Sequence, residues 1–133
     1  KPRDHSLAAF CVMGGVFSEG IDLKKERLIG AVIVGTGLPM VCVEQEVLRG
    51  YFEEKEEEGF DFAYQYPGMN KVLQAAGRVI RTTEDEGIIL LLDDRFLKKE
   101  YLELFPREWE HFQMVNRKNV GRCLSDFWES RGR

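Results

Sequence analysis

Three apolar runs of strand length are spaced along the chain. They cover residues 7–13, 29–34 and 88–92, and consist mainly of aliphatic side chains. Continuous runs of this length, closed by glycines or charged residues, are typical of strands that are buried on both faces of a parallel sheet. The pattern therefore predicts three buried strands.

The segments around these runs repeat their apolar side chains with the period of a helix. This periodicity predicts helices near residues 40–56, 67–82, 98–105 and 119–129. Strands alternating with helices indicate an α/β domain. Several side chains are expected to share an apolar face of the first helix, namely Val43, Val47, Leu48, Tyr51 and Phe52. Others in the tail are expected to pack on the sheet or in the core, namely Trp109, Phe112, Val120, Leu124, Phe127 and Trp128.

The helix expected at 67–82 carries a polar stripe opposite its apolar face. At about 100° per residue, Gln74, Arg78 and Arg81 fall within a stripe roughly 60° wide. The guanidinium group is a flat, permanently charged fork that suits phosphate oxygens. Two such groups one turn apart indicate a phosphate site, whereas the alternative is a pair of arginines in ordinary surface ion pairs.

The run at 88–92 ends in the charged residues Asp93, Asp94 and Arg95. A helix, a polar turn, a buried strand and charged residues at its carboxyl end are the layout of a ligand site in α/β proteins. The first run is followed by a second loop of interest, in which Glu19 and Asp22 flank Gly20. Carboxylates in this loop could accept hydrogen bonds from arginines or from a ribose hydroxyl, or the loop could be a solvated surface turn.

Two segments together resemble a known family. GGVFSEGIDL (14–23) and QAAGRVIRTTEDEGIILLLDDRF (74–96) are similar to motifs V and VI of superfamily 2 DNA helicases, and specifically to the XPD/DinG branch. The GLP at 37–39 and the YPGMNKVLQAAGR at 66–78 also fit this branch, so the resemblance covers about residues 7–97. One departure is Ser18, because relatives often have an aromatic residue before the motif V glutamate.

The resemblance implies a three-layer RecA-like α/β domain with a mainly parallel sheet, and the function of the C-terminal motor half of an ATP-dependent DNA helicase. Arg78 and Arg81 would be arginine fingers that reach the γ-phosphate of ATP. The remaining site residues would be Gln74 at the nucleotide or its attacking water, Gly77 at a close domain contact, and Glu19, Gly20 and Asp22 coupling the ATP site to DNA.

The partners that the resemblance implies are single-stranded DNA and an N-terminal motor domain of the same protein. The chain has no Gly-Lys dipeptide, so it lacks the phosphate-binding loop that would cradle ATP and Mg²⁺. We therefore expect residues 1–133 to be a single domain, most of the second motor domain, and to be inactive alone. An iron–sulfur cluster, where the family has one, belongs to the first motor domain.

Composition adds few constraints. The net charge of −4 is accounted for by residues 53–58, which contain five glutamates and one lysine and are expected to be a solvated helix end away from DNA. Three widely spaced cysteines form no disulfide framework or metal spacing, which favours buried thiols in the cytoplasm. No apolar run approaches the roughly 20 residues that span a bilayer, so no membrane is expected.

Two other classes of function remain open at this stage. One is a non-catalytic nucleic-acid-binding or regulatory module that keeps the fold. The other is a different phosphotransfer enzyme, in which Asp93 and Asp94 hold magnesium.

Overall fold

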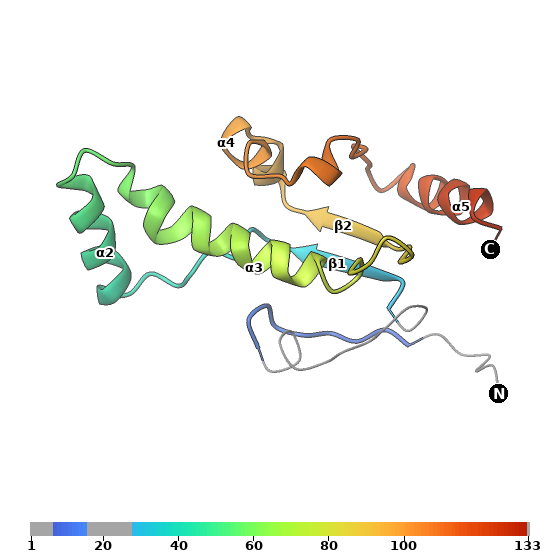
Figure 1. Cartoon of the computed structure of the whole chain (residues 1–133), viewed down its shortest axis with the longest axis horizontal. Helices are drawn as coiled ribbons and strands as arrows, with labels where there is room; N and C mark the ends of the chain where they lie inside the picture. The colour runs from blue at the N-terminus through green and yellow to red at the C-terminus, as the bar shows by residue number, and fades with distance from the viewer. Residues whose placement is uncertain (1–6, 16–27, 133) are drawn as a thin grey trace.

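A computed structural model describes residues 7–15 and 28–132 of the chain (Figure 1). Two strands, β1 (Gly30–Val34) and β2 (Ile88–Leu92), are joined by a long helical crossover. The crossover consists of α2 (Val43–Glu53), the π-helix η2 (Asp61–Gln65) and α3 (Tyr66–Ala76). After β2 come the 3₁₀-helix η3 (Asp94–Leu97), α4 (Lys99–Leu102), the 3₁₀-helix η4 (Arg107–Trp109) and α5 (Val120–Ser130).

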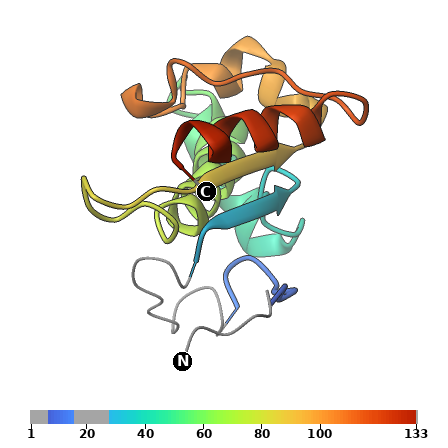
Figure 2. The ribbon, with the colours of Figure 1, turned by 90° about the vertical axis from the view of Figure 1, so that its right-hand side faces the viewer.

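The two strands are parallel neighbours, with Gly30 opposite Ile88 and Val34 opposite Leu92. Both runs were predicted as strands to within a residue at each end, and the parallel pairing confirms the α/β character of the chain. One face of the pair is covered by α3, and the core of the molecule lies between them (Figures 1 and 2). The core residues are Ile33, Met69, Val72, Ala76, Phe96 and Tyr101.

The other face of the sheet is not buried to the same extent. Val32 and Val34 point away from the core and are 62% and 70% exposed. Among the residues that the structure describes, the sheet has only these two strands. The structure therefore supports a parallel α/β domain, but it does not establish the three layers that we expected.

The strand expected at 7–13 is absent. Residues 7–12 have no regular structure, and Leu7, Phe10 and Val12 are each more than three-quarters exposed. An isolated strand leaves its backbone groups unpaired, so it forms only where a partner edge is available. In the described part of the chain, β1 pairs with β2 alone, and this segment has no such partner.

The helix expected at 67–82 is displaced toward the N-terminus. It continues directly from the π-helix η2 into α3 and ends at Ala76, with Gly77 as its C-cap residue. Glycine and the β-branched residues Val79 and Ile80 propagate a helix poorly, and the chain must turn back here to enter β2. The helix expected at 40–56 is also shorter, because α2 covers only Val43–Glu53.

The loop that follows β1 packs against the first turn of α3 with no space for side chains. A Cβ atom on Gly37 would lie 2.6 Å from the carbonyl oxygen of Gly68, and one on Gly68 would lie 2.7 Å from the carbonyl oxygen of Thr36. Gly37 also has a φ of +66°, which favours glycine. The backbone contact between these two glycines therefore sets how closely α3 approaches the sheet.

The C-terminal segment is packed less tightly than expected. No residue of α5 is buried, and its apolar stripe is half-buried rather than part of the core. An ion pair of 2.5 Å between Arg131 and Glu86 ties the end of this helix to the segment before β2. Trp109 packs against the core as expected, whereas Phe112 is 47% exposed.

The cysteines do not share one environment. Cys11 is exposed, while Cys42 and Cys123 are half-buried, so none of the three thiols is fully buried as expected. None of the helices in the described ranges is both long and apolar enough to cross a bilayer.

Candidate functional site

The predicted phosphate-binding arginines lie in the loop of residues 77–87, which we call the arginine loop. It starts at the end of α3 and leads into β2, so it lies at the amino-terminal end of the strands. Arg78 is half-buried in the turn that closes α3, and Arg81 is exposed in the extended part that follows. The expected helical stripe is therefore wrong, because Gln74 alone of the three residues lies within the helix.

A buried anchor separates the two arginines. Val79 is 4% exposed, and its amide donates to the carbonyl of Ala76 at 3.0 Å. A Cβ atom on Gly87 would collide with Cγ1 of Val79 and would lie 3.0 Å from the carbonyl oxygen of Ile29. Gly87 thus makes the space that Val79 fills, and this packing fixes the loop between Arg78 and Arg81.

The far side of the arginine loop is held by Asp85. Its Oδ2 accepts hydrogen bonds from the backbone amides of Arg81 at 3.0 Å and Thr82 at 2.8 Å. These backbone hydrogen bonds, from Arg81 and then from Thr82, lower the pKa of the Asp85 carboxyl group. These hydrogen bonds to Asp85 were not predicted from the sequence. An acidic residue three positions after a turn threonine is nevertheless a recognisable signal for a closed turn.

The other predicted site residues divide into two groups. Gln74 and Gly77 are exposed at the end of α3, next to Arg78. Gly77 has an ordinary helical φ of −64°, so its conformation does not require glycine. Glu19, Gly20 and Asp22 lie outside the residues that the structure describes.

The charged residues after β2 form a separate site at the carboxyl end of the sheet. The guanidinium of Arg95 donates to both oxygens of Asp93, from Nε at 2.9 Å and from Nη2 at 2.8 Å. The backbone amide of Arg95 also donates to Asp93 at 2.9 Å, which caps η3. These bonds from Arg95 lower the pKa of the Asp93 carboxyl group to about 2. The pair is structural, and the carboxylate that a magnesium site would need is already engaged.

Acid should weaken the fold through Asp93. A carboxyl group with a lowered pKa stabilises the fold above its unfolded pKa of 3.8, and this contribution is lost as the pH falls toward 2. We expect Asp93→Asn to lower the free energy of unfolding by about 1–2 kcal/mol at pH 7. The difference from the parent, measured by urea unfolding, should shrink between pH 4 and pH 2. A difference that does not change with pH would contradict the assignment to this ion pair.

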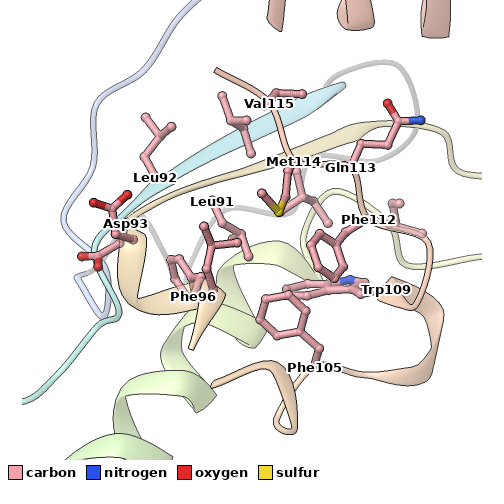
Figure 3. Close-up of a pocket in the computed structure, with 15 residues that line it drawn as sticks. Leu91, Leu92, Asp93, Phe96, Phe105, Trp109, Phe112, Gln113, Met114 and Val115 are labelled. Atoms are coloured by element: carbon pink, nitrogen blue, oxygen red, sulfur yellow. The ribbon is translucent and has the colours of Figure 1, made fainter. Parts of the chain in front are cut away.

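An apolar cavity of about 840 Å³ lies beside β2 (Figure 3). Leu91 and Leu92 line one side, and the opposite side is formed by the segment around Trp109, Phe112 and Met114. Ile80 is the one residue of the arginine loop that lines it, and the lining includes none of Gln74, Arg78 and Arg81. Its surface suits aliphatic or aromatic groups rather than a triphosphate, so it is distinct from the predicted phosphate site.

The described residues do not offer a metal site. Within residues 7–15 and 28–132, no three histidine, cysteine or acidic side chains are grouped as metal ligands would be.

The chain is similar to the C-terminal domain of helicases. The family model for the helicase C-terminal domain matches residues 2–112. The regulator of telomere elongation helicase 1 homolog of Caenorhabditis elegans is 29% identical, over 98% of this chain and 14% of that protein. The ATP-dependent DNA helicase chl1 of Schizosaccharomyces pombe is 30% identical, over 92% of this chain and 16% of that protein. The ATP-dependent DNA helicase DinG of Photobacterium profundum is 34% identical, over 65% of this chain and 13% of that protein. The chain thus spans roughly one seventh of the length of the first of these curated relatives.

Proposed function

Because the chain belongs to the helicase C-terminal domain family, we propose that it is the C-terminal motor half of an ATP-dependent DNA helicase of the XPD/DinG branch. The full-length protein would couple ATP hydrolysis to movement along single-stranded DNA and to unwinding of the duplex. Residues 1–133 would be most of a RecA-like motor domain, whose three layers would be complete only in the full-length protein.

The observation that carries this proposal is the construction of the arginine loop. Arg78 and Arg81 lie on either side of the buried Val79, and Asp85 holds the backbone of Arg81 through its amide. A guanidinium stabilises the charge of a phosphoryl group in transfer only if it is held in place before the reaction. The loop supports this requirement by fixing the backbone from which both guanidiniums extend, without holding the nucleotide itself.

ATP and Mg²⁺ would be bound mainly by the N-terminal motor domain. Arg78 and Arg81 would reach the γ-phosphate when the two domains close, and Gln74 would contact the nucleotide or its attacking water. Gly77 has no side chain and is exposed beside these residues, so another domain could approach the backbone closely there. When the two motor domains separate again after hydrolysis, Glu19, Gly20 and Asp22 would move relative to the DNA strand.

Two other functions are less well supported. A magnesium-dependent phosphotransfer enzyme would need Asp93 as a ligand, but both oxygens of Asp93 accept hydrogen bonds from Arg95. A non-catalytic nucleic-acid-binding module would not need two arginines in a loop whose backbone is fixed by Val79 and Asp85. It would bind DNA in the full-length protein without hydrolysing ATP.

The test compares ATP hydrolysis by the 133-residue chain and by the full-length protein. The chain alone should show no turnover above background, because it lacks the phosphate-binding loop. The full-length protein should hydrolyse ATP, and single-stranded DNA should increase the rate. Turnover by the chain alone that survives a control for contaminating enzymes would contradict the proposal that this chain supplies only part of the ATP site. If the full-length protein binds DNA without hydrolysing ATP, the non-catalytic module would be favoured.

A further inference from the structure

The helix α2 directs its apolar stripe away from the molecule. Val43, Val47 and Tyr51 follow one another at four-residue spacing, so they lie on one face of the helix. Their exposed fractions are 76%, 67% and 50%. A helix on a folded domain normally buries such a stripe against the core. We refer to these three residues as the α2 stripe.

Other side chains of α2 attach the helix to η2. Phe52 stacks on Phe62 of η2, with ring centroids 4.5 Å apart. The hydroxyl of Tyr64, a residue that is 3% exposed, donates to Oε1 of Glu46, and this bond raises the pKa of Tyr64 to about 12. The α2 stripe is thus exposed although the helix itself packs against η2.

The turn between α2 and η2 is also closely packed. Gly59 is buried against α2, where a Cβ atom would lie 2.6 Å from Cγ of Glu53 and would collide with the carbonyl oxygen of Arg49. Together, α2 and η2 form a hairpin at the end of α3 that is remote from the arginine loop (Figure 1). The α2 stripe is thus presented on a rigid support and is separate from the proposed ATP site.

The segment that carries the α2 stripe is rich in glutamate. Residues 43–58 contain seven glutamates against one arginine and one lysine, so this segment is more negative than the whole chain with its net charge of −4. Arg49 is itself engaged by Glu53 at 2.7 Å and by Glu46 at 3.8 Å. Lys55 lies over the ring of Tyr51 at the end of the stripe, 4.2 Å from its centroid.

We propose that the α2 stripe and its acidic margin dock a basic amphipathic helix of a partner protein. Apolar side chains spaced by one turn on that helix would cover Val43, Val47 and Tyr51, and flanking lysines or arginines would face the glutamates. The same negative charge disfavours nucleic acid and anionic membranes, because both carry phosphates. This inference does not depend on the ATPase activity proposed above.

The experiment measures binding of a synthetic probe to the full-length protein, and failure of the probe to bind would overturn the proposal, because another part of the same protein would then cover the stripe. The probe is a fluorescent 18-residue helical peptide with leucines along one face and lysines elsewhere, and a peptide with glutamates in place of the lysines is its control. Val47→Ser should weaken binding of the leucine–lysine peptide at least tenfold in fluorescence anisotropy. Val12→Ser is the matched control, because Val12 is similarly exposed at 79% but lies outside the hairpin, and it should change the affinity less than twofold.

Charge is tested separately with Glu44→Gln. This variant should weaken binding of the lysine peptide at low salt, and raising the salt concentration should reduce the difference from the parent. Circular dichroism should show unchanged helix content in all variants. The proposal is wrong if Val47→Ser and Val12→Ser have equal effects, or if the glutamate peptide binds as tightly as the lysine peptide. It is also wrong if light scattering shows that Val47→Ser converts a dimer into a monomer, because the stripe would then be covered by a second copy.

Discussion

Replacing Arg78 or Arg81 with alanine in the full-length protein should lower ATP turnover by on the order of 10³-fold, the scale of a lost arginine finger. Each guanidinium would stabilise charge on the γ-phosphoryl group during transfer, and alanine cannot replace it. Affinity for single-stranded DNA should change little, because the arginine loop is proposed to face the nucleotide. The measurement is steady-state ATP hydrolysis at saturating DNA.

The matched control for this experiment is Arg107→Ala, which removes an exposed arginine from η4. It should leave turnover unchanged. Thermal melting is needed beside the kinetics, because Arg78 is half-buried and its aliphatic part contributes packing. Turnover that stays within a few-fold of the parent in both arginine variants would mean that these residues form ordinary surface ion pairs.

Gly68→Ala should strongly destabilise the fold. The added Cβ would lie 2.7 Å from the carbonyl oxygen of Thr36 and 3.0 Å from the amide nitrogen of Leu38. These are backbone atoms, so the clash can be relieved only by moving α3 away from the loop. We expect a loss of about 3 kcal/mol, which corresponds to a fall in melting temperature of about 10 °C for a domain of this size.

Gly50→Ala is the matched control, because Gly50 lies within α2 and a Cβ there would meet nothing within 4 Å. Alanine at this helical position should stabilise the protein by about 0.5–1 kcal/mol. Both values come from urea unfolding of the 133-residue chain. Equal effects of the two substitutions would show that the close contact between Gly37 and Gly68 does not constrain the fold.

The two strands could be predicted from the sequence because each is a continuous apolar run of strand length that ends at glycines or charged residues. Residues 7–13 have a similar composition but form no strand, since pairing depends on a neighbour that local sequence does not specify. The extent of α3 was predicted poorly for a related reason. The helical period continues through Val79 and Ile80, but the burial of Val79 beside Gly87 is a tertiary contact.

The candidate site was predictable in its residue types but not in its geometry. The arginines were identified from their spacing, whereas the contact between Val79 and Gly87 became recognisable only in three dimensions, and the turn signal of Asp85 was overlooked. Periodicity likewise placed Val43, Val47 and Tyr51 on one face of a helix, together with Leu48 and with Phe52, which instead stacks on Phe62. It could not indicate that this face points to solvent, because a period specifies the face but not what covers it.

The two strands differ in how well charged residues protect them from self-association. The run of β2 is preceded by Glu84, Asp85 and Glu86 and followed by two aspartates, and such flanking charges oppose stacking of identical segments. The run of β1 is preceded by Lys24, Lys25, Glu26 and Arg27, but no charged residue follows it before Glu44. Its outer edge is unpaired within the described residues, and Val32 and Val34 are exposed. Aggregation of a partly folded chain during synthesis or storage is therefore expected to begin at β1.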